Sequence, residues 1–99
     1  MATWVGLVVC ELFVPGATSL KDKRREVRSF VDRVHKRFRV SVAETGLHEL
    51  HQRAEVSMAV VAGSEGEVER LLATLREMGD ELSGAVVSRW DDQVIEGVG

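Results

Sequence analysis

Two stretches with helical periodicity, each set between short β-like runs, constrain the fold of this chain most. In residues 20–38 the apolar side chains recur at the spacing of one helix face, and residues 64–82 repeat this pattern. Each stretch begins at a serine that is followed three residues later by an acidic residue, a pair typical of a helix start. These pairs are Ser19 with Asp22 and Ser64 with Glu67. We therefore expect two helices, each with one apolar face to bury.

Four β-like runs surround the two helices. The first, residues 3–14, is rich in β-branched and aliphatic side chains and stops at a Pro-Gly pair. Three further runs show the alternation of half-buried strands, at residues 39–44, 54–62 and about 85–95. The order β-α-β-β-α-β predicts a ferredoxin-like α+β fold, with a four-stranded antiparallel sheet and both helices on one face. With 99 residues, the chain suits a single domain spanning 1–99.

One face of such a sheet has no helix over it. We assign the even-numbered residues of the first strand to the helix side, because the apolar residues of the two middle strands share that parity. The opposite face then carries a contiguous apolar patch, which usually marks an interface. Closed homodimers are the commonest oligomers, so we expect a homodimer. The predicted dimer interface contains Val5, Leu7, Val9, Phe13, Val61 and Val87.

Charge is distributed unevenly along the chain. The net charge is −3, yet residues 21–39 carry nine Lys or Arg against three acidic residues. Several of these cations crowd the first turns of the predicted helix, where the macrodipole is positive and each opposes it by about 0.3–1 kcal/mol. A bound anion would relieve this repulsion. The predicted nucleic-acid- or anion-binding residues are Ser19 as the helix cap and the cations Lys21, Lys23, Arg24, Arg25, Arg28 and Lys36. The alternative is a solvated basic face along the edge of the core.

Other candidate sites carry weaker signals. His48 and His51 form an i, i+3 pair near acidic residues, but a metal site needs three or four ligands, so we predict no metal. The single cysteine, Cys10, lies among valines and is expected to be a buried apolar residue. The chain has no P-loop, no nucleophile elbow and no C-x-x-C motif. We expect a non-enzymatic protein without a cofactor.

The sequence also bears on location. No apolar run reaches the ~18–20 residues that a membrane span needs. The first ten residues lack the basic lead-in and the cleavage site of a signal peptide. We therefore expect a cytoplasmic protein with no membrane partner.

Three segments resemble a known family. Residues 19–24 (SLKDKR), 38–44 (FRVSVAE) and 52–54 (QRA) resemble the YlxP-like family of small bacterial proteins, and the similarity runs over about residues 3–95. The family is similar in having a ferredoxin-like fold and is classed as a domain of unknown function. Its genes often lie beside those for translation initiation and ribosome maturation. The resemblance thus implies a link to ribosomes or RNA, and it supplies no catalytic residue.

Together these observations predict a dimeric ferredoxin-like protein that docks on structured RNA or a ribosomal particle through its first helix. The central strands of its sheet lack the aromatic residues with which similar folds stack RNA bases, so phosphate contacts from the helix would dominate. The alternative is a homodimeric protein-interaction or small-anion-binding regulatory module. In that case the basic helix would bind an acidic protein or a small anion.

Overall fold

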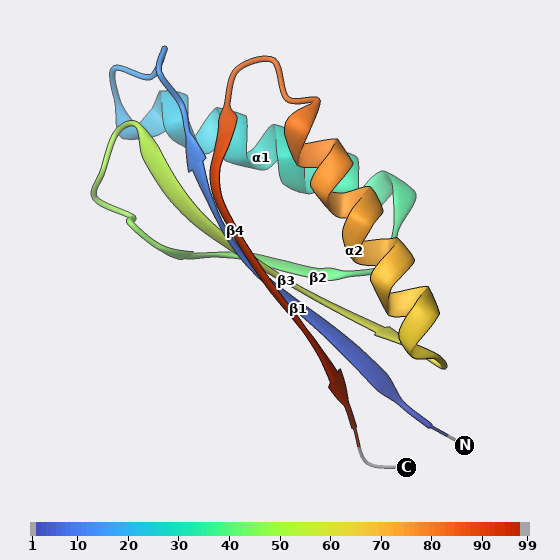
Figure 1. The fold of residues 1–99 in the computed structure, drawn as a ribbon. Coiled ribbons are helices and arrows are strands. Elements are labelled where there is room, and N and C mark those ends of the chain that lie inside the picture. Colours follow the sequence, from blue (N-terminus) through green and yellow to red (C-terminus); the bar gives the residue numbers. More distant parts are fainter. Residues whose placement is uncertain (1, 98–99) are drawn as a thin grey trace.

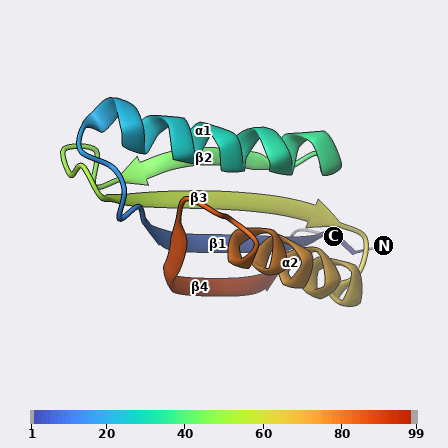
Figure 2. The same cartoon turned by 90° about the horizontal axis from the view of Figure 1, so that it is seen from above.

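A computed structural model describes residues 2–97 and contains six elements in the predicted order. The strands form one antiparallel sheet in the order β2-β3-β1-β4. Both helices cover the same face of this sheet, with α1 on the β2 and β3 side and α2 on the β1 and β4 side (Figure 1 and Figure 2). This confirms the ferredoxin-like α+β fold. The elements are β1 (Trp4–Phe13), α1 (Leu20–Arg37), β2 (Ser41–Gly46), β3 (Arg53–Ala62), α2 (Glu65–Asp80) and β4 (Val86–Glu96).

Both helices begin at the predicted serine caps. The Ser19 hydroxyl accepts a hydrogen bond from the N–H of Asp22 at 3.1 Å, and the Ser64 hydroxyl accepts one from the N–H of Glu67 at 3.2 Å. Each cap satisfies one of the N–H groups that a helix start leaves without an intrahelical partner. Within residues 2–97, neither helix is long and apolar enough to cross a membrane.

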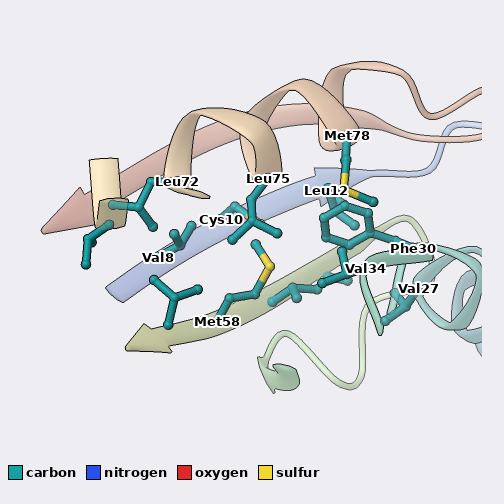
Figure 3. Packing of buried hydrophobic residues seen from close by; sticks show 14 residues of the cluster. Val8, Cys10, Leu12, Val27, Phe30, Val34, Met58, Leu72, Leu75 and Met78 are labelled. Carbon is teal, nitrogen blue, oxygen red and sulfur yellow. The ribbon is translucent and has the colours of Figure 1, made fainter. Parts of the chain in front are cut away.

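The core lies between the sheet and the two helices. Phe30 and Val34 of α1 and Leu75 of α2 are buried against the sheet (Figure 3). Gly6 allows α2 to pack close to β1, because a Cβ atom at this position would lie 2.7 Å from Cγ1 of Val68. The strands contribute the even-numbered residues Val8, Cys10, Leu12, Ala54, Val56, Met58 and Val60, all buried. The predicted helix-side parity of β1 and β3 and the burial of Cys10 are therefore confirmed.

Strand β4 contains an irregularity that the alternation pattern did not reveal. Its pairing with β1 changes register around Ser88, which has no partner residue on β1. The Ser88 hydroxyl instead donates a hydrogen bond to the carbonyl oxygen of Glu11 at 3.2 Å. One extra residue in a strand exchanges the two faces on either side of it. The β-bulge at Ser88 therefore reverses the parity of the strand's first two residues.

Val87 is consequently misplaced in the predicted dimer interface. Its side chain packs against the core, and a Cβ atom on Gly79 of α2 would lie 2.9 Å from its Cγ2. Val86 takes its place on the open face, where it pairs with Phe13 and is 57% exposed. The other five predicted interface residues lie on the open face, because they pair in register across β1, β3 and β4.

Three connections gather at one end of the sheet, opposite the termini: β1 to α1, β2 to β3, and α2 to β4 (Figure 1). Gln52 joins the first two. Its side-chain Nε2 donates hydrogen bonds to the carbonyl oxygens of Pro15 at 3.1 Å and Ala17 at 3.2 Å. Its own carbonyl accepts from the N–H of Val14 at 2.8 Å. The connection that leads into α1 is thereby fixed where the cationic half of that helix begins.

Candidate anion-binding surface

The N-terminal half of α1 carries a shallow groove of about 440 Å³ that is lined by four cationic side chains. All four are exposed, and their spacing of three, four and seven residues keeps them on one flank of the helix. They are Lys21, Arg24, Arg25 and Arg28. The structure therefore brings together four of the six predicted cations.

These four cations have no carboxylate within ion-pair distance in the part of the chain that the structure describes. The ion pairs found there join Lys23 to Glu44, Arg53 to Glu11, Arg76 to Asp80 and Arg89 to Asp91. Four like charges near the positive end of the helix dipole repel each other and oppose that dipole. A bound anion would lower this electrostatic energy.

Asp22 is the acidic residue of the first helical turn, and its carboxylate already takes part in hydrogen bonds within the chain. Its carboxylate accepts hydrogen bonds from the backbone N–H of Thr18 at 3.1 Å and from the Thr18 hydroxyl at 2.9 Å. The bond from the Thr18 N–H, followed by the one from its hydroxyl, holds the pKa of Asp22 below its ordinary value. Asp22 therefore stays ionised as a structural cap beside the groove.

Lys23 does not belong to this surface. Its side chain is only 1% exposed, and Nζ lies 3.1 Å from Oε2 of Glu44. Nζ also donates hydrogen bonds to the carbonyl oxygens of Leu47 at 2.9 Å and His48 at 3.3 Å. The burial of Lys23 therefore contradicts its place among the predicted nucleic-acid- or anion-binding residues. The signal was present in the sequence, because Lys23 stands four residues before Val27 and so shares the apolar face of the helix.

The contacts of Lys23 fix the connection between β2 and β3. Leu47 has a φ of 58°, a left-handed conformation that is uncommon for a residue other than glycine. Its carbonyl accepts the Lys23 ammonium and also the N–H of Leu50 at 3.1 Å, which closes a turn. Lys23 thus anchors this turn to α1 and acts as a structural residue.

The remaining predicted residues lie outside the groove. Lys36 is exposed, but it stands eight residues beyond Arg28, which is about 12 Å further along the helix axis. Ser19 caps the helix and does not line the groove. Nε2 of His48 lies 3.2 Å from the carbonyl oxygen of Glu44. Within residues 2–97, no group of three or more His, Cys, Asp or Glu side chains could hold a metal ion.

Two further hollows lie near the start of α1. One, of about 430 Å³, lies between the β1–α1 and α2–β4 connections and contains Asp22 and Glu26 against a single cation, Arg25. The other, of about 500 Å³, is lined by residues 17–18 and 50–53 and contains one arginine. Of these three hollows, the α1 groove is the one lined by cations alone, so it is the best candidate for binding an anion.

The fold and this groove define a small ferredoxin-like protein with a cationic surface on its first helix. The sequence model of the family described as "Protein of unknown function (DUF503)" matches residues 5–91. The protein described as "Uncharacterized protein YlxP" from Bacillus subtilis (strain 168) is 36% identical over 73 residues, which cover 70% of this chain and 79% of YlxP. The chain therefore belongs to this family of unknown function, and the resemblance to YlxP-like proteins is confirmed.

Proposed function

We propose that this protein binds structured RNA, such as that of a ribosomal particle, through the cationic groove of α1. The observation that carries the proposal is the convergence of four exposed cations without a carboxylate within ion-pair distance among residues 2–97. Three of the four are arginines, whose planar guanidinium groups can hold a phosphate through two hydrogen bonds. The ribosomal context is what the resemblance to the YlxP-like family implies, since genes of that family often lie beside those for translation initiation and ribosome maturation.

In the proposed complex the protein recognises the shape and the phosphate groups of the RNA rather than its base sequence. Contacts to phosphates position a protein on nucleic acid and carry no direct sequence information. Proteins that read single-stranded RNA on such a sheet stack bases on aromatic side chains of the central strands. Among residues 2–97, the aromatic side chain on the open face of β1 and β3 is Phe13 at a strand end, and the Arg53 guanidinium lies over it at 5.2 Å. This arrangement supports the helix, and not the sheet, as the RNA-binding element.

Salt dependence of binding to an RNA hairpin and to ribosomal subunits tests the proposal. Four phosphate contacts predict that affinity falls about 50- to 150-fold between 50 and 200 mM salt. The double variant Arg24→Glu, Arg28→Glu is expected to lose this binding. Its matched control is Arg33→Glu, Arg37→Glu, because both pairs are four residues apart on the same helix and change the net charge equally. The control pair lies outside the groove and is expected to retain most of the affinity.

Three results would contradict this function. Binding that survives the Arg24→Glu, Arg28→Glu change would place the site elsewhere. An equal loss in both double variants would mean that only the net charge matters. Saturation by sulfate or a nucleotide, with an affinity that does not rise with RNA length, would favour the small-anion-binding regulatory module instead.

A further inference from the structure

The open face of the sheet has an apolar half, which lies along the first half of β1 and the end of β3. Leu7 and Val9 of β1 are 40% and 41% exposed, and Val61 of β3 is 67% exposed. Val5 and Ile95 lie on the same face, because they pair with each other and Val5 also pairs with Val61. Both helices lie on the other side of the sheet, so no element among residues 2–97 covers these side chains (Figure 2). A contiguous aliphatic patch of this kind usually marks an interface.

The size of the face suits a symmetric dimer. The central strand β1 has 10 residues and the sheet has four strands. At ~3.3 Å per residue and ~4.8 Å between strands, the face measures about 33 by 19 Å, or roughly 600 Å². Two such faces packed together remove about 1,200 Å² from solvent, which reaches the lower end of the range for stable, specific interfaces.

The charges of the face suit a second copy of the same surface. Arg53 pairs with Glu11 at 2.7 Å, and Arg89 pairs with Asp91 at 2.6 Å. All four residues belong to the open face by register, so much of its charge is already balanced within one chain. A nucleic acid would require a cationic surface, which this face does not provide. An identical face brings no strong net charge of its own.

The edges of the sheet are poorly suited to pairing with another strand. Strand β2 is short, with six residues, and is interrupted by a bulge at Thr45. Strand β4 carries the bulge at Ser88 and the charged residues Arg89, Asp91 and Asp92. Short, bulged and charged edge strands discourage the addition of a further strand. A second copy is therefore better accommodated on the face than at an edge.

We propose that two copies of the chain pack their open sheet faces together around a twofold axis, with the apolar rows of β1 in contact near Leu7. Such an isologous interface brings each patch against itself. The assembly has four layers, with the helices of each copy on the outside. The two α1 grooves then face away from each other, so one dimer presents two separate cationic surfaces. This inference goes beyond the proposed RNA binding and does not depend on it.

Sedimentation equilibrium of the full chain at micromolar concentrations tests the dimer. The wild type is expected to have twice the mass of one 10.9 kDa chain, at low and at high salt, because the centre of the contact is apolar and the charged pairs of the face are balanced within one chain. The Leu7→Glu variant is expected to have the mass of a single chain. Its matched control is Leu50→Glu, since Leu50 is 45% exposed on the β2–β3 connection, outside the sheet face, and this variant is expected to remain a dimer.

Circular dichroism and a cooperative thermal transition establish that both variants are folded. If Leu7→Glu does not fold, Val61→Lys takes its place, because Val61 is the most exposed side chain of the patch. A single-chain mass for the wild type throughout the micromolar range would overturn the proposal, as would a Leu7→Glu or Val61→Lys variant that remains a dimer. The variant Arg24→Glu, Arg28→Glu is expected to remain a dimer. A failure of the proposed RNA binding can therefore be distinguished from a failure of the proposed dimer.

Discussion

Lys21 and Lys23 lie two residues apart in α1 and have opposite environments. Successive residues of a helix are rotated by about 100°, so these two side chains point about 160° apart. Lys21 lines the exposed groove, whereas the Lys23 ammonium is buried against Glu44 and two backbone carbonyl groups. A lysine among basic neighbours therefore has to be assigned by its helical phase as well as by its charge.

The two lysines are expected to differ in their contribution to stability. Lys23→Met removes one partner of a buried ion pair. The Glu44 carboxylate then loses its counter-ion, and the carbonyl oxygens of Leu47 and His48 lose the hydrogen bonds from the ammonium. This change is expected to lower the free energy of unfolding by about 3 kcal/mol. Lys21→Met, the matched control, is expected to change it by less than about 0.5 kcal/mol. Urea unfolding measures both values, and equal effects would contradict the structural role of Lys23.

The buried thiol of Cys10 is expected to make the free energy of unfolding depend on pH in the alkaline range. Burial raises the pKa of its thiol to about 11, from an ordinary value of 9.0. The folded state therefore keeps the proton over a range in which the unfolded state loses it. Stability is expected to fall as the pH rises from about 9 to about 11, and the Cys10→Ala variant is expected to show a shallower fall. Urea unfolding across this range measures both slopes, and parallel slopes would rule out the contribution of the thiol.

At the scale of elements, α1 combines a good cap with an unfavourable charge arrangement. Ser19 and Asp22 satisfy groups at its start, yet exposed cations follow within the first turns. The second helix has Glu65 and Glu67 in its first turn, which is the favourable arrangement. The exposed cations at the start of α1 therefore lower the free energy of unfolding, and they do so where the groove lies.

This charge arrangement predicts that a Lys→Glu substitution has opposite effects on stability at the two ends of α1. Lys21→Glu lies in the first turn and is expected to raise the free energy of unfolding by about 0.5–1 kcal/mol at low salt, while it weakens RNA binding. Lys36→Glu lies in the last turn, where a cation is favourable, and is expected to lower stability by a similar amount. Urea unfolding at low and high salt measures both, and the differences should shrink as salt screens them. A loss of stability in both variants would refute this account of the groove.

The sequence predicted the helices and strands well because the helix and strand periods repeat over many residues in each element. The apolar stripe of α1 and the serine caps placed both helices within one or two residues of their observed bounds. The bulge at Ser88 was not predicted, because the alternation of apolar and polar residues does not reveal an extra residue in a strand. Val87 was therefore assigned to the wrong face of the sheet. Four cations of the site were predicted from helical spacing alone. Lys23 was misassigned because it was grouped with its neighbours by charge, although its helical phase places it on the apolar face of α1.

At the scale of the whole molecule, the two candidate binding surfaces lie on opposite sides of the sheet. The cationic groove is on α1, and the apolar patch is on the sheet face that neither helix covers. Substitutions in one surface therefore leave the contacts of the other intact, and their effects on stability should add. This separation makes it possible to test RNA binding and dimerisation independently in one protein.

The burial of Lys23 has a consequence for how relatives of this chain can diverge. Its ammonium meets one carboxylate and two carbonyl oxygens, and one of these carbonyls belongs to a residue in a left-handed turn. An arginine is longer, and its planar head cannot place donors at the same three points. At the exposed position 21 we expect an arginine to be tolerated, whereas an arginine at position 23 is expected to require a rebuilt β2–β3 connection. We therefore expect that turn and the lysine beneath it to change together among relatives of this chain.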